Sequence, residues 1–220
     1  MQEIILSGIV CMEAERVISF EDHGCYLATL ETADLIDVFI RPVYKQIAVH
    51  SLNHYISTKG LIVYGWCLMS NKLYLACRAQ KSTSFKEIRK SFKQFTAEKI
   101  IEAILNEPAE RQQWLLEHFQ KNSGFLKTHK KLEVWQPIKD LVNLDLARPE
   151  NMAEHLELIH NIPVQQRIVR YASDFIYSSA YDYETGREGL VKITKPHAVI
   201  QALDDIENRK SIFKAKFNHK

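Results

Sequence analysis

Two β-rich runs separated by a short polar turn constrain the fold of this chain more than any other feature. Leu61–Met69 is its longest apolar run, and Lys72–Ala79 follows directly after Ser70 and Asn71. Such runs, joined by a turn of this kind, predict a β-hairpin. The alternation of the second strand divides its side chains between two faces, with Lys72, Tyr74, Ala76 and Arg78 on one and Leu73, Leu75, Cys77 and Ala79 on the other. We expect the second face to be core and the first to be available for function.

A further strand and several helices are expected around the hairpin. Cys25–Thr32 alternates weakly and predicts a strand, and Val43–Thr58 has apolar residues at helical spacing. Ser84 and Glu87 form a capping box, which begins a helix that runs to about Leu105. Other helices are expected to begin at Pro108, to cover Pro149–His160 before a stop at Pro163, and to cover Pro196–Glu207. Antiparallel strands mixed with separate helices predict an α+β fold with one sheet face covered.

The charges of the chain are balanced in number but not in position. There are 29 Lys and Arg against 27 Asp and Glu. Residues 13–37 hold seven acids and one base, whereas residues 72–99 hold eight bases and two acids. Clustered cations beside a strand and along a helix are typical of a surface that binds a phosphate backbone. The alternative interpretation is a solvated helix face with acidic neighbours.

Composition argues against several other classes of protein. The longest apolar run is about half the length that a membrane span requires, so no transmembrane helix is expected. The N-terminus has neither a basic region nor a long apolar core, so secretion is not expected. The cysteines form no C-x-x-C pair and no zinc spacing, and we expect reduced thiols in a cytoplasmic protein at Cys11, Cys25, Cys67 and Cys77.

A series of short segments carries a resemblance to a known family. In chain order the segments are Val63–Ala76, Ile88–Ile100, Val134–Gln136, Leu158–Val164, Ile168–Val169, Asp174–Tyr183 and Gly189–Leu190. Their sequences and their order resemble the REP-associated tyrosine transposases, which are single-tyrosine members of the HUH nuclease group. We therefore interpret residues 1–24 as an N-terminal extension, 25–193 as a transposase-like domain, and 194–220 as a C-terminal helix with a basic tail.

The resemblance implies both a fold and a chemistry. The fold is a ferredoxin-like antiparallel sheet with helices packed on one face, usually in a homodimer, and the family cuts single-stranded DNA beside hairpin-forming sequences. Two histidines on one strand and a polar helix residue hold Mg²⁺ or Mn²⁺ at the scissile phosphate. A tyrosine one helical turn before that polar residue attacks the phosphorus and forms a covalent 5′-phosphotyrosine.

Each of these catalytic positions departs from the family pattern in this chain. The strand histidines are matched by Lys72 and Tyr74, the nucleophile by Leu158, and the helix ligand by Ile162. Lys72 brings positive charge to a cation site and has no free lone pair at neutral pH, and Leu158 has no nucleophilic atom. We therefore expect a degenerate member with no catalytic residue, no metal and no other cofactor, in which strand cleavage is lost.

Other side chains near these positions offer further roles. Tyr74 could stack on a base or act as a displaced nucleophile, although packing is the simpler role. His155 could bind a metal but is more simply a surface or capping group, and His160 is expected to hydrogen-bond locally at the helix end. Trp135 is expected to be a buried anchor. Packing first and base stacking second are expected of Tyr171, Tyr177, Tyr181 and Tyr183.

The leading hypothesis is a transposase-related DNA-binding protein that recognises single-stranded or hairpin DNA without cutting it. Its binding surface is predicted at Arg78, Lys81, Arg89, Lys90, Lys93, Lys130 and Lys131. One alternative is an active single-strand nuclease or transposase with relocated catalytic residues. The other is a protein-interaction remnant without nucleic-acid binding, in which the basic helix pairs with the acidic N-terminal segment.

Overall fold

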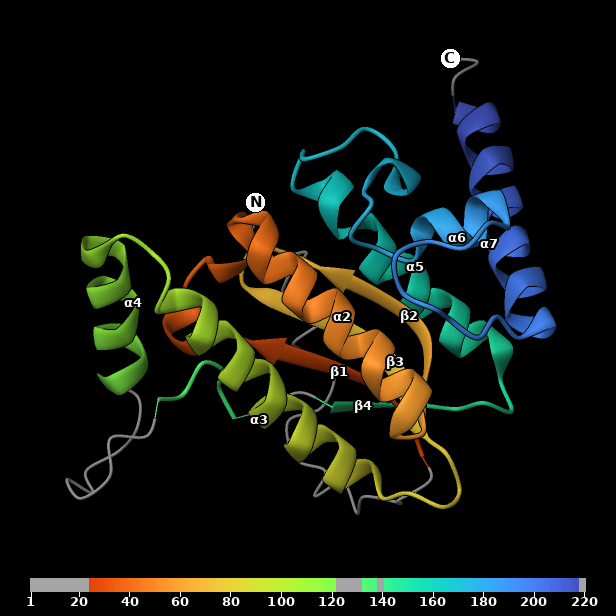
Figure 1. The fold of residues 1–220 in the computed structure, drawn as a ribbon. Coiled ribbons are helices and arrows are strands. Elements are labelled where there is room, and N and C mark those ends of the chain that lie inside the picture. The colour runs from red at the N-terminus through yellow and green to blue at the C-terminus, as the bar shows by residue number, and fades with distance from the viewer. Residues whose placement is uncertain (1–23, 122–131, 138–140, 218–220) are drawn as a thin grey trace.

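The computed structural model describes residues 24–121, 132–137 and 141–217. Within these ranges the chain forms a four-stranded antiparallel sheet with helices on both sides (Figure 1). The predicted N-terminal extension lies outside the described residues except for Gly24, and Lys130 and Lys131 of the predicted binding surface also lie outside them. The domain boundary between residues 193 and 194 stays a prediction.

The sheet is built around the predicted hairpin. β2 (Leu61–Leu68) and β3 (Lys72–Ala79) pair antiparallel, and β1 (Cys25–Glu31) pairs with the other edge of β3. The short strand β4 (Leu141–Leu144) adds to β1, which gives the order β2-β3-β1-β4. The hairpin and the strand near the start of the domain are therefore confirmed, whereas no sequence pattern predicts β4.

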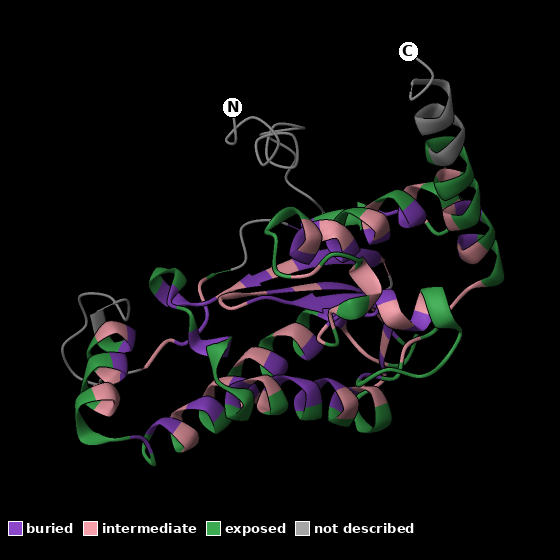
Figure 2. Cartoon of the chain, turned by 90° about the horizontal axis from the view of Figure 1, so that it is seen from above, coloured by how far each residue is buried: buried purple, intermediate pink, exposed green. Residues whose placement is uncertain are grey.

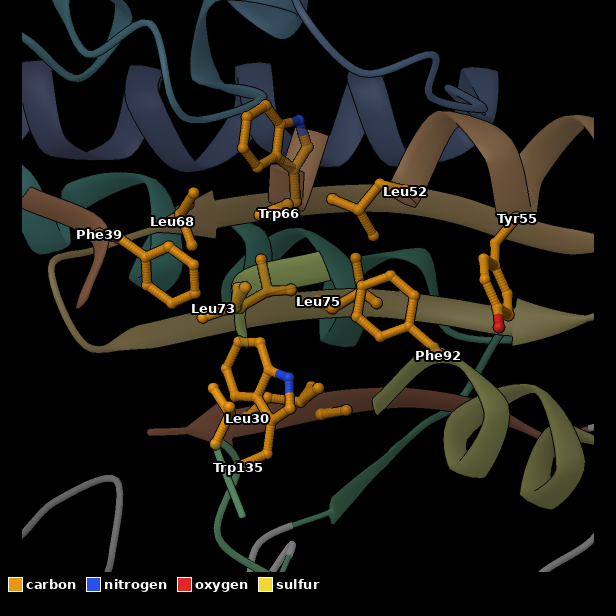
Figure 3. Close-up of a cluster of buried hydrophobic side chains, with 14 of the residues drawn as sticks. Leu30, Phe39, Leu52, Tyr55, Trp66, Leu68, Leu73, Leu75, Phe92 and Trp135 are labelled. Carbon is orange, nitrogen blue, oxygen red and sulfur yellow. The ribbon is translucent and has the colours of Figure 1, made fainter. Parts of the chain in front are cut away.

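The first face of the sheet carries the larger core. α2 (Pro42–Thr58) and α3 (Phe85–Ile104) pack on this face, close to their predicted bounds. Their apolar side chains meet those of the strands in a cluster that includes Leu30, Leu52, Trp66, Leu73, Leu75 and Phe92 (Figure 3). Trp135 is buried at the edge of this cluster, and its Nε1 donates a hydrogen bond to Thr96 Oγ1 at 2.8 Å. The prediction of a buried anchor is confirmed.

The opposite face, which was expected to be available for function, is covered by a second helical layer (Figure 2). α5 (Pro149–Gln165) lies on this face, and α7 (His197–Phe217) packs against α5. A Cβ at Gly65, just after a bulge in β2, would collide with Leu156 of α5, so this close approach requires glycine. The α+β fold with helices packed on an antiparallel sheet is confirmed. The second face is not free, because apolar residues of α5 and α7 extend the core over it.

Two helices are longer than the sequence pattern predicts. α5 continues through Pro163 to Gln165, because a proline in the last turn of a helix removes only one hydrogen bond. At the end of the helix, Ile162 O accepts a hydrogen bond from Gln166 N–H, and Pro163 O accepts one from Ile168 N–H. α7 likewise extends beyond the predicted end at Glu207 to Phe217. α4 (Ala109–Lys121) begins directly after Pro108, as predicted.

The remaining elements are short. η1 (Ala33–Leu35) and η2 (Val38–Ile40) connect β1 to α2, and η3 (Ala172–Asp174) and α6 (Ala180–Thr185) follow α5. The segment Tyr177–Ser179 runs along the outer edge of β2, where Leu68 N–H donates to Tyr177 O at 2.8 Å and Ser179 N–H donates to Trp66 O at 2.9 Å. None of the described helices is both long and apolar enough to cross a membrane.

Candidate nucleic-acid interface

Lys72 and Tyr74, the two strand positions matched to histidines, lie on the β3 face that α5 covers. Lys72 is directly opposite Glu31 in the β1–β3 register, and its Nζ lies 2.6 Å from Glu31 Oε1. Both side chains are about 30% exposed, so solvent screens the pair and it contributes at most about 1 kcal/mol to stability. The pair matters more for chemistry than for stability. The first of the two matched strand positions is occupied by an ammonium group that is already paired with a carboxylate.

The side chain of Tyr74 packs against the apolar core between the sheet and α5, which includes Ile162 of α5. Burial raises the pKa of the Tyr74 phenol to about 12, and the negative charges of Cys67 and Glu31 when ionised act in the same direction. The phenol therefore stays protonated at neutral pH. No environment that would activate it as a nucleophile surrounds Tyr74 among the described residues.

Leu158 and Ile162, the two helix positions, lie one turn apart on α5 but have different surroundings. Ile162 is 8% exposed and belongs to the core between α5 and the sheet, whereas Leu158 is 43% exposed. Neither side chain offers an oxygen, a nitrogen or a sulfur. The structure therefore brings Ile162 to the same cluster as Tyr74 and leaves Leu158 at the surface.

The two histidines of α5 make hydrogen bonds that stabilise the fold. His155 Nδ1 lies 2.7 Å from Asn151 O within the helix. His160 is buried, and its Nε2 lies 2.8 Å from Ser179 Oγ, which in turn accepts a hydrogen bond from Trp66 N–H at 2.9 Å. The expected local bond at the helix end is thus replaced by a link between α5 and the segment that borders β2. Burial lowers the pKa of His160 to about 3, so the ring is neutral.

No group of three or more metal-binding side chains is found in the part of the chain that the structure describes. The three described cysteines, Cys25, Cys67 and Cys77, are buried and unpaired by disulfides. Burial raises the pKa of the Cys25 thiol and of the Cys67 thiol to about 12, which keeps both protonated. These thiols are suited to packing rather than to metal binding or nucleophilic attack.

The structure divides the predicted basic surface between the two sides of the sheet. Arg78 points toward the α5 side, where its guanidinium carbon lies 5.9 Å from the ring centroid of Tyr64. The other described members of the set lie on α3 or just before it, and α3 packs on the opposite side. Arg78 therefore does not extend the α3 surface.

The cations of the α3 region differ in how accessible they are. Lys81 and Lys90 are exposed, as is Lys86, which lies one turn before Lys90. Arg89 and Lys93 are half-buried, and the Lys93 ammonium donates a hydrogen bond to Gln136 O at 2.5 Å. The solvent-facing positive charge of this region therefore comes mainly from the lysines at 81, 86 and 90.

The tyrosines of the segment after α5 have separate roles. Tyr183 is mostly buried, and its hydroxyl donates to Tyr64 O at 2.8 Å. Tyr177 lies under the Lys45 ammonium, which is 4.5 Å from the ring centroid. Tyr171 is 56% exposed, and the Arg170 guanidinium lies 5.3 Å from its ring centroid.

Two basic residues near these rings are absent from the predicted surface. The sequence Arg170-Tyr171 places a cation beside an aromatic ring and could have identified one of them. Lys45 could not be found in this way, because α2 and the segment after α5 come together only in the fold.

The comparisons with known proteins give a likeness in structure alone. No known family and no curated protein matches the sequence. A solved structure of a REP-associated tyrosine transposase bound to a REP hairpin is similar to this chain, with a TM-score of 0.54 and 13% sequence identity. The match covers 84% of this chain and 96% of the other. The chain therefore shares the fold of that transposase, as the resemblance of the short segments implies.

Proposed function

We propose that this chain is a transposase-related DNA-binding protein that recognises single-stranded or hairpin DNA and does not cut it. The observation that carries the proposal is the state of the four matched positions within a retained fold. A lysine paired with Glu31, a packed tyrosine and two hydrocarbon side chains stand where the resemblance implies metal ligands and a nucleophile. Binding requires none of the groups that have been replaced.

The loss of cleavage follows from the chemistry of these side chains. A divalent cation needs lone pairs from nitrogen or oxygen, and a protonated lysine offers none while adding repulsion. A phosphotyrosine needs a hydroxyl at the helix position, and Leu158 carries no such group. Tyr74 carries the phenol of β3, but its raised pKa and its packing in the core oppose its use as a nucleophile.

The retained DNA-facing surface is proposed on α3 and the turn before it. The exposed cations there are Lys81, Lys86 and Lys90, within a 28-residue segment that carries a surplus of six positive charges. Such a surface neutralises phosphates regardless of base sequence. Arg89, Lys93, Lys130 and Lys131 remain members of the proposed interface, and Arg78 remains one on the other side of the sheet. The homodimer and the cytoplasmic location stay predictions.

A salt series tests the binding proposal directly. A fluorescein-labelled DNA hairpin with an unpaired flank is titrated with the protein, and anisotropy is measured at increasing concentrations of NaCl. If three cations contact phosphates, the slope of log K against log salt is about −2 for a single strand. An absence of binding at low salt contradicts the proposal and favours the protein-interaction alternative. Binding with no salt dependence contradicts the proposed cationic surface on α3.

A further inference from the structure

The segment between α5 and α6, residues 166–179, exposes three large apolar side chains. Ile168, Tyr171 and Ile176 are 54%, 56% and 59% exposed. In Figure 1 this loop, drawn in cyan, projects from the body of the fold above α5. Three large apolar side chains left in water within one short loop are typical of a surface that meets a partner.

The same loop brings positive charge next to its aromatic rings. Arg167 and Arg170 are exposed, and neither has an acidic partner among the described residues. The Arg170 guanidinium lies beside the Tyr171 ring, and the Lys45 ammonium of α2 lies over the Tyr177 ring. Asp174 is the one acid of the loop, whereas the loop contains two bases, Arg167 and Arg170.

This combination selects one class of partner. The three cations, Arg167, Arg170 and Lys45, attract phosphates. The flat face of an aromatic base packs against exposed apolar and aromatic side chains. Base faces are accessible in a single strand and are hidden by stacking in a duplex. Because Tyr171 is more than half exposed, part of its ring remains open for such stacking.

We infer that the α5–α6 loop is a stacking platform for unpaired bases of DNA. Tyr171 stacks on a base, Ile168 and Ile176 widen the apolar surface, and Arg167, Arg170 and Lys45 contact the adjacent phosphates. The inference rests on the proposed DNA binding and adds a second contact region, on a loop of the α5 side rather than on α3. It predicts that the protein distinguishes strands with bases from strands of equal charge without them.

The test compares two labelled single strands of equal length, an oligothymidylate and a strand of abasic sites, by fluorescence anisotropy. The wild-type protein is expected to bind the oligothymidylate more tightly, by about 5- to 150-fold, which is the range for one stacked base. Tyr171→Ala is expected to remove most of this preference and to leave binding of the abasic strand unchanged. Tyr171→Phe, which keeps the ring, is expected to retain it.

Trp114→Ala is the matched control, because Trp114 is 47% exposed and belongs to α4 rather than to the loop. It is expected to bind both strands as the wild type does. A wild-type preference for bases that survives Tyr171→Ala overturns the platform and leaves DNA binding intact. Equal binding of both strands by the wild type likewise overturns the platform and leaves DNA binding intact. If the wild type binds neither these strands nor the flanked hairpin, both the proposed function and the stacking platform are wrong.

Discussion

Lys72 and Glu31 face each other across the β1–β3 ladder, and their charged atoms are 2.6 Å apart. The pair lies at the first of the two strand positions that the resemblance matches to metal-binding histidines. A carboxylate at this place could assist a metal, but here it neutralises the lysine. An ion pair therefore stands at the strand position that the resemblance matches to a histidine, and this leads to the first prediction.

Restoring the strand histidines is not expected to restore cleavage. Lys72→His with Tyr74→His rebuilds two imidazoles on one strand face, but Ile162 supplies no third ligand and Leu158 supplies no nucleophile. We expect weak binding of Mn²⁺ by calorimetry and no covalent protein–DNA adduct on a denaturing gel. Lys72→Ala with Tyr74→Ala is the matched control, which should bind no Mn²⁺.

Further addition of Leu158→Tyr and Ile162→Asn is expected to be the minimum for a covalent adduct. If the two-histidine variant alone forms an adduct with hairpin DNA, a nucleophile other than the four matched residues is present. The inactive-protein interpretation is then wrong.

Reversing two exposed cations of the α3 region is expected to weaken DNA binding without unfolding the protein. Lys81→Glu with Lys90→Glu removes two phosphate contacts, so the salt slope should become shallower by about 1.4. Lys93 is less suitable for this test, because its ammonium holds Gln136 O and its loss would disturb packing.

The matched control for that pair is Lys99→Glu on the same helix. Its ammonium is paired with Glu102 at 2.8 Å, and it lies outside the proposed interface. Affinity and salt slope should stay close to the wild-type values in this variant, as measured by anisotropy. Because the control reverses one charge and the test variant two, a control loss of about half the test loss would show that only net charge matters and that no surface on α3 is specific.

Stability is expected to fall in acid because of His160. Its pKa is about 3 in the folded protein and about 6.5 in the unfolded chain. Below pH 6.5 the unfolded state therefore binds a proton that the folded state does not, and folding weakens by up to about 1.4 kcal/mol per pH unit until the pH approaches 3.

Urea unfolding at several pH values between 7.5 and 5 checks this prediction. His160→Gln should show a shallower loss of stability below pH 6.5 than the wild type. His155→Gln, at a half-exposed position of the same helix, should keep the wild-type slope. If the free energy of unfolding falls equally with decreasing pH in the wild type and in His160→Gln, then His160 takes up its proton in the folded state as readily as in the unfolded state, which contradicts the prediction.

Glu107 is expected to contribute strongly to stability at the junction of α3 and α4. Its side chain is 3% exposed, and it accepts hydrogen bonds from Arg41 and from the Tyr44 hydroxyl, the latter at 2.7 Å. Glu107→Ala leaves these donors without their acceptor, so the free energy of unfolding should fall by about 2–4 kcal/mol. Glu110→Ala at an exposed position nearby should change it by no more than about 0.5 kcal/mol. Chemical denaturation measures both.

The elements that the sequence predicts well are those with a strong local signal. The helix α3 begins directly after Ser84, as the sequence pattern predicts, although the Ser84 side chain makes no cap hydrogen bond. The hairpin turn at Ser70 and Asn71 likewise agrees with the bounds of β2 and β3. β4 has no comparable signal, because its four residues acquire their strand conformation from pairing with β1.

The arrangement of the candidate site depends on contacts that no local pattern contains. The apolar spacing of α5 and α7 shows that these helices are packed, but not which face of the sheet they cover. The pairing of Lys72 with Glu31 requires the β1–β3 register, and the approach of Lys45 to Tyr177 requires the complete fold. Arg78 is the exception, because strand alternation, which is a local pattern, already places it on the face of β3 opposite to α3.

The most direct test of the account measures binding and covalent capture in one sample. Labelled hairpin DNA with an unpaired flank is incubated with the protein and Mn²⁺, and the sample is divided between a native gel and a denaturing gel. We expect a shifted complex on the native gel and intact, free DNA on the denaturing gel. A shortened strand or a protein–DNA band that survives denaturation would contradict the loss of cleavage, and an absence of any native complex would contradict DNA binding.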